Sequence, residues 1–197
     1  MKIRSGFVSN SSSSSFILKF DKLPESVEEV KVLLFGENPP LLTTYWGDDA
    51  VSTQQIAEVL FRDINSARIM GVDGVVSQVR EQVYFSKYSV DEGRELVSSE
   101  YLEEFDRLYK MIEKEDEEHS KRRLEYNDDD GWDAHYKKMD KLSEPLYDIV
   151  EKSIKEKCSD LDKYIEVEYG DGEGMVFSYL EHSGILDKIK IQRFSHH

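Results

Sequence analysis

The sequence predicts an α+β fold, in which a small, mainly antiparallel sheet formed by the chain ends packs on central helices and a helical hairpin protrudes. Apolar and polar residues alternate near both ends of the chain, which is the period of a β-strand. Apolar residues at helical spacing fill most of the middle. A chain of 197 residues can bury one substantial core. We therefore expect a single domain over residues 1–197, with the hairpin at about 99–157 as an outgrowth.

The first strand follows a run of serines near the N-terminus. There Phe16, Leu18 and Phe20 alternate with Ile17 and Lys19, as in a strand with one buried face.

Three helical patterns come next. They cover residues 24–35, 52–71 and 73–84, and the stretch 37–50 between the first two has the composition of a loop.

The longest helical pattern loses its apolar stripe after Ile112. Residues 113–123 are all polar or charged, so this part has no apolar face to bury, and residues 113–133 should protrude into water. A second helical pattern follows the acidic tip at 128–130 and is expected to kink or restart at Pro145. Together the two patterns predict a helical hairpin.

Strand periodicity returns toward the C-terminus. Residues 164–169 and 189–194 alternate as strands do, while the apolar run 175–182 fits either a return strand or a helix. The basic residues of the first and last strands should lie beside Glu166 and Glu168.

Charge is distributed unevenly along the chain. The net charge is −15, yet residues 1–20 and 188–197 each carry three basic side chains and no acid. The residues between them therefore carry −21. Such a surface repels nucleic acid and anionic membranes, so we expect neither non-specific nucleic-acid binding nor membrane binding, and a basic protein fits better as a partner.

A single cysteine, Cys158, excludes an intrachain disulfide and a cysteine-based zinc site, and it indicates a reducing compartment. We expect no export signal, because serines follow the basic start where an apolar stretch would be needed. We expect no transmembrane helix either, because no apolar run reaches the ~20 residues that it needs. A cytoplasmic protein is expected, and the sequence says nothing about its oligomeric state.

The serine-rich stretch is the first candidate site. Small hydroxyl side chains and free backbone N–H groups would let a phosphate or carboxylate approach closely. The candidate anion-binding residues are Arg4, Ser9, Asn10, Ser11, Ser12 and Ser13. A flexible, solvated serine linker is the alternative, although the apolar residues on both sides of the run would anchor it.

The second candidate site lies near the C-terminus, where three of the five histidines are found. Imidazole and carboxylate groups are the ligands of zinc and iron sites. The candidate ligands of a divalent metal are therefore Glu181, His182, His196 and His197. An exposed chain end is the alternative.

Common catalytic and ligand-binding motifs are missing from the sequence. The acidic turns do not have EF-hand spacing, because Tyr126 or Tyr169 would occupy the first ligand position. There is also no phosphate-binding loop, dinucleotide fingerprint, H-E-x-x-H pair or nucleophile elbow. No enzyme class is indicated, and enzymatic activity stays open.

The start of the chain, K-x-R-x-G-F-V-S-N-S-S-S-S-S-F, closely resembles an N-terminal motif of many uncharacterised proteins of bacteria and their phages. Some of those proteins also end in a motif similar to E-H-S-G followed by R-x-S-H-H, which here spans residues 181–184 and 193–197. The resemblance implies a bacterial or phage origin and carries no function. It argues against a plain linker at the N-terminus.

Two functions fit these patterns. The first is a non-catalytic interaction protein of phage or bacterial origin, which binds another macromolecule through its acidic hairpin or its basic ends. The second is an enzyme or ligand-binding domain whose site combines the serine loop with the terminal histidines. For that site we expect the first and last strands in one sheet, with residues 9–15 beside Ser195, His196 and His197.

Overall fold

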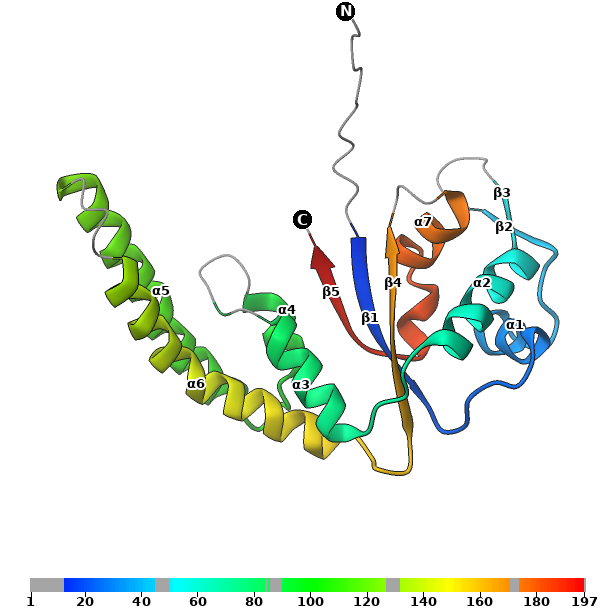
Figure 1. The fold of residues 1–197 in the computed structure, drawn as a ribbon, viewed down its shortest axis with the longest axis horizontal. Coiled ribbons are helices and arrows are strands. Elements are labelled where there is room, and N and C mark those ends of the chain that lie inside the picture. Colours follow the sequence, from blue (N-terminus) through cyan, green and yellow to red (C-terminus); the bar gives the residue numbers. More distant parts are fainter. Residues whose placement is uncertain are drawn as a thin grey trace, which may run out of the picture. The chain divides into compact units, whose positions relative to one another are not determined.

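The computed structural model describes residues 13–44, 50–83, 85, 90–126, 132–170 and 174–196. The fold is α+β, as predicted, with helices and two small antiparallel sheets (Figure 1). The chain divides into two compact units. We call the first, Met1–Met70 with Leu161–His197, the sheet unit, and the second, Gly71–Asp160, the helical unit. Whether they form one domain stays a prediction.

The main sheet consists of β1 (Ser13–Phe20), β4 (Lys163–Gly170) and β5 (Lys190–His196), in the order β4-β1-β5. Both neighbours of β1 run antiparallel to it, and the register shifts between Ile17 and Leu18 on the β5 side. The prediction that strands from the two chain ends form the sheet is therefore confirmed.

The core of the sheet unit lies on one face of this sheet. Phe16, Leu18 and Phe20 point into it because they alternate along β1. Helices α1 (Val27–Phe35), α2 (Thr53–Ser66) and α7 (Met175–His182) supply the other buried residues. Burying each large apolar side chain contributes roughly 1.5–3 kcal/mol, so this face holds the unit together.

Two helices of the sheet unit begin at serine caps. Ser26 and Ser52 cap α1 and α2, where their side chains accept hydrogen bonds from backbone N–H groups three residues on.

One segment of the sheet unit differs from the sequence prediction, and another settles a choice between strand and helix that the sequence left open. The stretch expected to be loop contains two paired strands, β2 (Leu42–Thr44) and β3 (Ala50–Ser52), too short for alternation to be visible. The ambiguous run near the C-terminus is helix α7, and a 3-10 helix, η2 (Ile185–Lys188), links it to β5.

The helical unit contains α3 (Val72–Gln82), α4 (Val90–Leu96), α5 (Leu102–Tyr126) and α6 (Trp132–Lys157). Helices α5 and α6 lie side by side as the predicted hairpin (Figure 1). Helix α6 runs through Pro145 as one helix, so no restart occurs there. Within the described residues, no helix is both long and apolar enough to cross a membrane.

The distal part of the hairpin corrects one expectation. Glu115 and His119 continue the buried face of α5 beyond Ile112, and His135 and Met139 of α6 are buried as well. The two imidazole rings stack with their centroids 3.8 Å apart. This part therefore does have a face to bury, made of polar side chains. The protrusion of residues 113–133, some of which lie outside the described residues, stays a prediction.

Glu115 is the centre of that polar face. Arg122 donates to its Oε1 at 3.0 Å, and the ammonium of Lys138 donates to Oε2. Burial alone would raise the pKa of Glu115, but these two cations outweigh it and hold the pKa below the ordinary value. The buried carboxylate is thus fully paired.

Candidate functional site at the meeting of the chain ends

Pairing of β1 with β5 brings the two ends of the chain together. Ser13 lies opposite His196 and Ser14 opposite Ser195, at the end of the sheet where β1 begins and β5 finishes (Figure 1). For the described residues, this confirms that the serine run lies beside the C-terminal segment. Several predicted site residues lie outside the described part of the chain: Arg4, Ser9, Asn10, Ser11, Ser12 and His197.

Glu181 reaches the sheet from α7. Its neighbours Tyr179 and Leu180 are buried in the core, and Glu181 itself is only 2% exposed. Ser14 of β1, which is fully buried, donates its hydroxyl to Oε1 of Glu181 at 2.9 Å. A buried carboxylate is costly unless it is paired, so this contact fixes α7 against the start of β1.

Arg193 of β5 completes the cluster. Its Nε and Nη2 donate to Oγ of Ser14 at 3.1 and 2.9 Å, and Nη2 lies 3.7 Å from Oε1 of Glu181. The guanidinium also lies over the ring of Phe16, 5.5 Å from its centroid. The guanidinium charge therefore compensates the buried carboxylate from one side.

The second oxygen of Glu181 is used differently. Oε2 is buried and accepts no hydrogen bond among the described residues. Nε2 of His182 lies 3.4 Å from it, on a side chain that is 31% exposed. Two ligands of a tetrahedral zinc ion, each about 2.0–2.1 Å from the metal, lie about 3.3 Å apart. The carboxylate and imidazole thus have the separation of two neighbouring metal ligands.

The chain turns sharply after His182. Gly184 has a φ of 72° in the left-handed region, and a Cβ there would come within 3.1 Å of the Asp187 carboxylate. The backbone N–H of Ile185 donates to Oγ of Ser183 at 3.2 Å. The spacing E-H-S-G therefore combines the two candidate ligands with the turn that ends their helix.

Ser13 does not join this cluster. It alternates with Ser14 along β1, and its hydroxyl donates to Glu168 of β4 at 2.8 Å. In the structure this hydroxyl therefore donates its hydrogen bond to a carboxylate of the protein itself. The anion site proposed from the sequence otherwise falls on undescribed residues and stays a prediction.

The lysines of the first and last strands pair with acids in the segments that flank the strands, and further acids lie on β4. Glu168 lies on β4 beside β1, as expected. Lys19 pairs with Asp162 at 2.9 Å and Lys190 with Asp187 at 2.7 Å, both from segments that flank the strands.

Ser14 and Arg193 contact the candidate ligand Glu181 or each other, and the sequence analysis did not name them as candidate site residues. Both belong to the motifs at the chain ends. The sequence signal that could have identified Ser14 is the alternation along β1, which places it on the same face as Phe16 and Leu18. Their partner Glu181 could not be placed, because its segment read equally as strand or helix. The cluster therefore joins the serine run, E-H-S-G and R-x-S-H-H.

The predicted metal ligands are only partly described. Among described residues, no group of three or more His, Cys, Asp or Glu side chains is placed to hold a metal ion. Glu181 and His182 are a pair, while the side chain of His196 and all of His197 lie outside the described residues. The four-ligand site stays a prediction.

Comparison of the chain with protein-family models, curated proteins and solved structures finds no match. The function must therefore be argued from the cluster itself.

Proposed function

We propose that this protein binds a divalent transition-metal ion at the meeting of its chain ends. Glu181 and His182 supply two ligands, and the terminal His196 and His197 supply the others. The observation that carries the proposal is the buried Oε2 of Glu181, which lacks a hydrogen bond among the described residues and faces an imidazole nitrogen. Carboxylate and imidazole together suit zinc or iron better than calcium or magnesium.

The other oxygen of Glu181 supports the same reading. Metal-binding carboxylates are held in orientation by hydrogen bonds to their second oxygen. Here Ser14 donates to Oε1, and Arg193 lies on that side of the carboxylate. Ser14 and Arg193 are thus positioning residues that leave Oε2 for the ion.

Metal analysis of the purified protein and titration with Co²⁺, followed by its visible absorption, test the proposal. We expect one equivalent of metal, and at least tenfold weaker binding in Glu181→Gln, His182→Ala and the double change His196→Ala with His197→Ala. Glu168→Gln, a carboxylate on the adjacent strand that binds Ser13, is the matched control and should bind normally. No bound metal, or equal binding by all variants, would refute the proposal.

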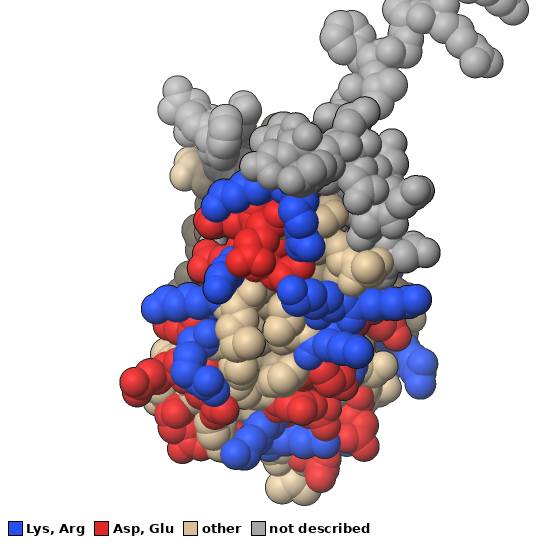
Figure 2. All heavy atoms as spheres, turned by 90° about the vertical axis from the view of Figure 1, so that its left-hand side faces the viewer, with Lys and Arg blue, Asp and Glu red and all other residues tan. Residues whose placement is uncertain are grey.

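A second candidate is a non-catalytic interaction protein that binds a basic partner. It is favoured by the helical unit, whose residues 71–160 contain 25 acidic and 15 basic side chains, a net charge of −10. Red and blue groups nevertheless alternate on the face drawn in Figure 2, consistent with exposed pairs such as Lys114–Glu118. A partner held by this dispersed charge should be released by moderate salt.

Pull-downs from a bacterial lysate at low and high salt test the second candidate. Basic partners that appear only at low salt would support it. Partners that do not change with salt would count against an electrostatic interaction.

A further inference from the structure

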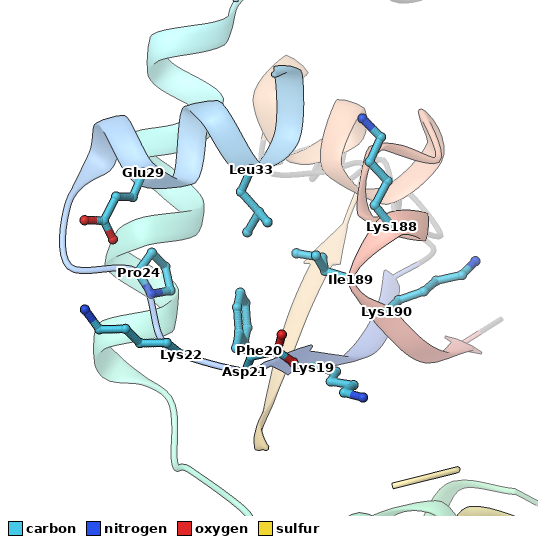
Figure 3. A pocket seen from close by; sticks show the side chains of 10 residues that line it. All are labelled: Lys19, Phe20, Asp21, Lys22, Pro24, Glu29, Leu33, Lys188, Ile189 and Lys190. Atoms are coloured by element: carbon cyan, nitrogen blue, oxygen red, sulfur yellow. The ribbon is translucent and has the colours of Figure 1, made fainter. Parts of the chain in front are cut away.

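A separate hollow lies in the sheet unit, between α1 and the strands β1 and β5. Its wall comes from the end of β1 and the turn after it, from α1, and from the junction of η2 with β5 (Figure 3). Its volume is about 520 Å³, within the range of clefts that hold small molecules. None of the residues of the metal-site proposal lines it.

The floor of this hollow is apolar. Phe20 and Ile189 are almost fully buried beneath it, while Leu33 is 37% exposed and points into it from α1 (Figure 3). Pro24 adds a further apolar wall. The floor therefore offers apolar contact to the body of a ligand.

The rim is basic, in a chain with 41 acidic and 26 basic residues. Four lysines line the hollow, Lys19, Lys22, Lys188 and Lys190, against two acids, Asp21 and Glu29. Three of these lysines come from strands or turns at the two basic ends of the sequence. The two ends of the sequence thus supply most of the lysines around an apolar floor.

The acidic partners of these lysines stand outside the hollow. Lys22 pairs with Glu25 at 2.7 Å and Lys190 with Asp187 at 2.7 Å, and neither acid lines the hollow. Such pairs are exposed and contribute little, so an anion in the hollow can share or replace them.

Other polar groups of the wall have structural roles. The Glu29 carboxylate accepts from the backbone N–H of Glu25 in the first turn of α1. The ammonium of Lys188 donates to the Leu34 carbonyl in its last turn. Lys19 pairs at 2.9 Å with Asp162, whose side chain is only 11% exposed. Lys22 and Lys190 are therefore the cations best suited to meet a ligand.

We propose that this hollow binds a small organic anion with an apolar body, such as an aryl or alkyl group that carries one sulfonate, carboxylate or phosphate. The apolar body lies on Leu33, Phe20 and Ile189. The anionic group meets one lysine at the rim, Lys22 on one side of the hollow or Lys190 on the other (Figure 3).

Fluorescence titration with 1-anilinonaphthalene-8-sulfonate tests the proposal, because this probe joins an aryl body to one sulfonate. We expect saturable binding of one probe per chain. The double change Lys22→Glu with Lys190→Glu should weaken it about tenfold or more, and Leu33→Ser should weaken it severalfold. All variants should keep the circular dichroism spectrum and melting temperature of the parent.

Two matched controls separate the hollow from general stickiness. Val32→Ser changes the neighbouring α1 residue, which is 39% exposed and does not line the hollow. Lys155→Glu changes a lysine of the helical unit in a similar exposed pair with Glu151. Both should bind the probe as the parent does.

Two further ligands separate the two parts of the proposal. N-phenyl-1-naphthylamine has the same aryl body without the charge, and inorganic sulfate has charge without the body, so each should bind at least tenfold more weakly. Equal binding of either ligand, absence of saturable binding, or equal losses in the controls and the hollow variants would overturn the proposal.

Discussion

Glu181 in the sheet unit and Glu115 in the helical unit are both buried carboxylates, but their oxygens are used differently. Both oxygens of Glu115 accept hydrogen bonds from cations, Arg122 and Lys138. One oxygen of Glu181 accepts from a serine, and the other accepts no hydrogen bond among the described residues. The fold alone explains the fully paired carboxylate of Glu115, whereas the second oxygen of Glu181 is the observation on which the metal-site proposal rests.

The largest expected difference concerns the arginine beside each carboxylate. Arg193→Ala leaves Glu181 buried without the guanidinium that compensates it, and should lower the free energy of unfolding by about 3 kcal/mol. Arg122→Ala leaves Lys138 on Glu115, and since Arg122 is 58% exposed, the loss should be at most about 1 kcal/mol. Urea denaturation followed by circular dichroism measures both.

Arg193→Lys sharpens this prediction. The lysine keeps the charge but loses the paired donation of Nε and Nη2 to Ser14, so it should restore only part of the stability. If Arg193→Ala and Arg122→Ala lowered the free energy of unfolding equally, the distinction between the two carboxylates would be wrong.

The next effect is the pH dependence of Glu115. Its folded-state pKa lies below the ordinary value of 4.5, so its ionised form stabilises the fold above pH 4.5, and this stability is lost as the pH falls through the folded-state pKa. Glu115→Gln should cost about 2 kcal/mol at pH 7 and progressively less below pH 4.5. Urea denaturation from pH 7 to pH 3 measures the difference.

The exposed Glu117 is the matched control for that series. Glu117→Gln should leave the pH profile close to that of the parent. A difference between parent and Glu115→Gln that stays constant down to pH 3 would contradict the pairing of Glu115 with its two cations.

The smallest effect comes from the turn behind Glu181. Gly184→Ala forces an alanine into the left-handed region and against Asp187, and should lower the melting temperature by an amount equivalent to about 1 kcal/mol. Gly71→Ala, at a φ of −90° with open space around it, should change the melting temperature little. Similar shifts for both would show that the positive φ is unimportant.

The main strands and long helices could be predicted because their patterns are local. Phe16, Leu18 and Phe20 alternate along one strand, and this alternation can be read from neighbouring residues alone. The distal part of α5 was expected to have no apolar face, and residues 113–123 have none, but the burial of the polar Glu115 and His119 was not expected, because they look solvated when α5 is read alone. Their burial depends on His135 and Lys138 of the facing helix, which no single-helix pattern displays.

The candidate site shows the same limit. Glu181 and His182 were selected as residues that bind metals, and the serine run as residues that bind anions, from their chemistry alone. Ser14 and Arg193 became relevant only once α7 was a helix packed on the sheet, since that packing brings both to Glu181.

By itself, the sequence determined the α+β class, the strands at the chain ends, the hairpin and the basic charge of both termini, because each depends on residues near one another in the chain. The tertiary structure alone decided which polar side chains meet. Contacts such as Ser14 with Glu181 join residues 167 positions apart, and their geometry is set by how α7 packs on the sheet, not by any local periodicity.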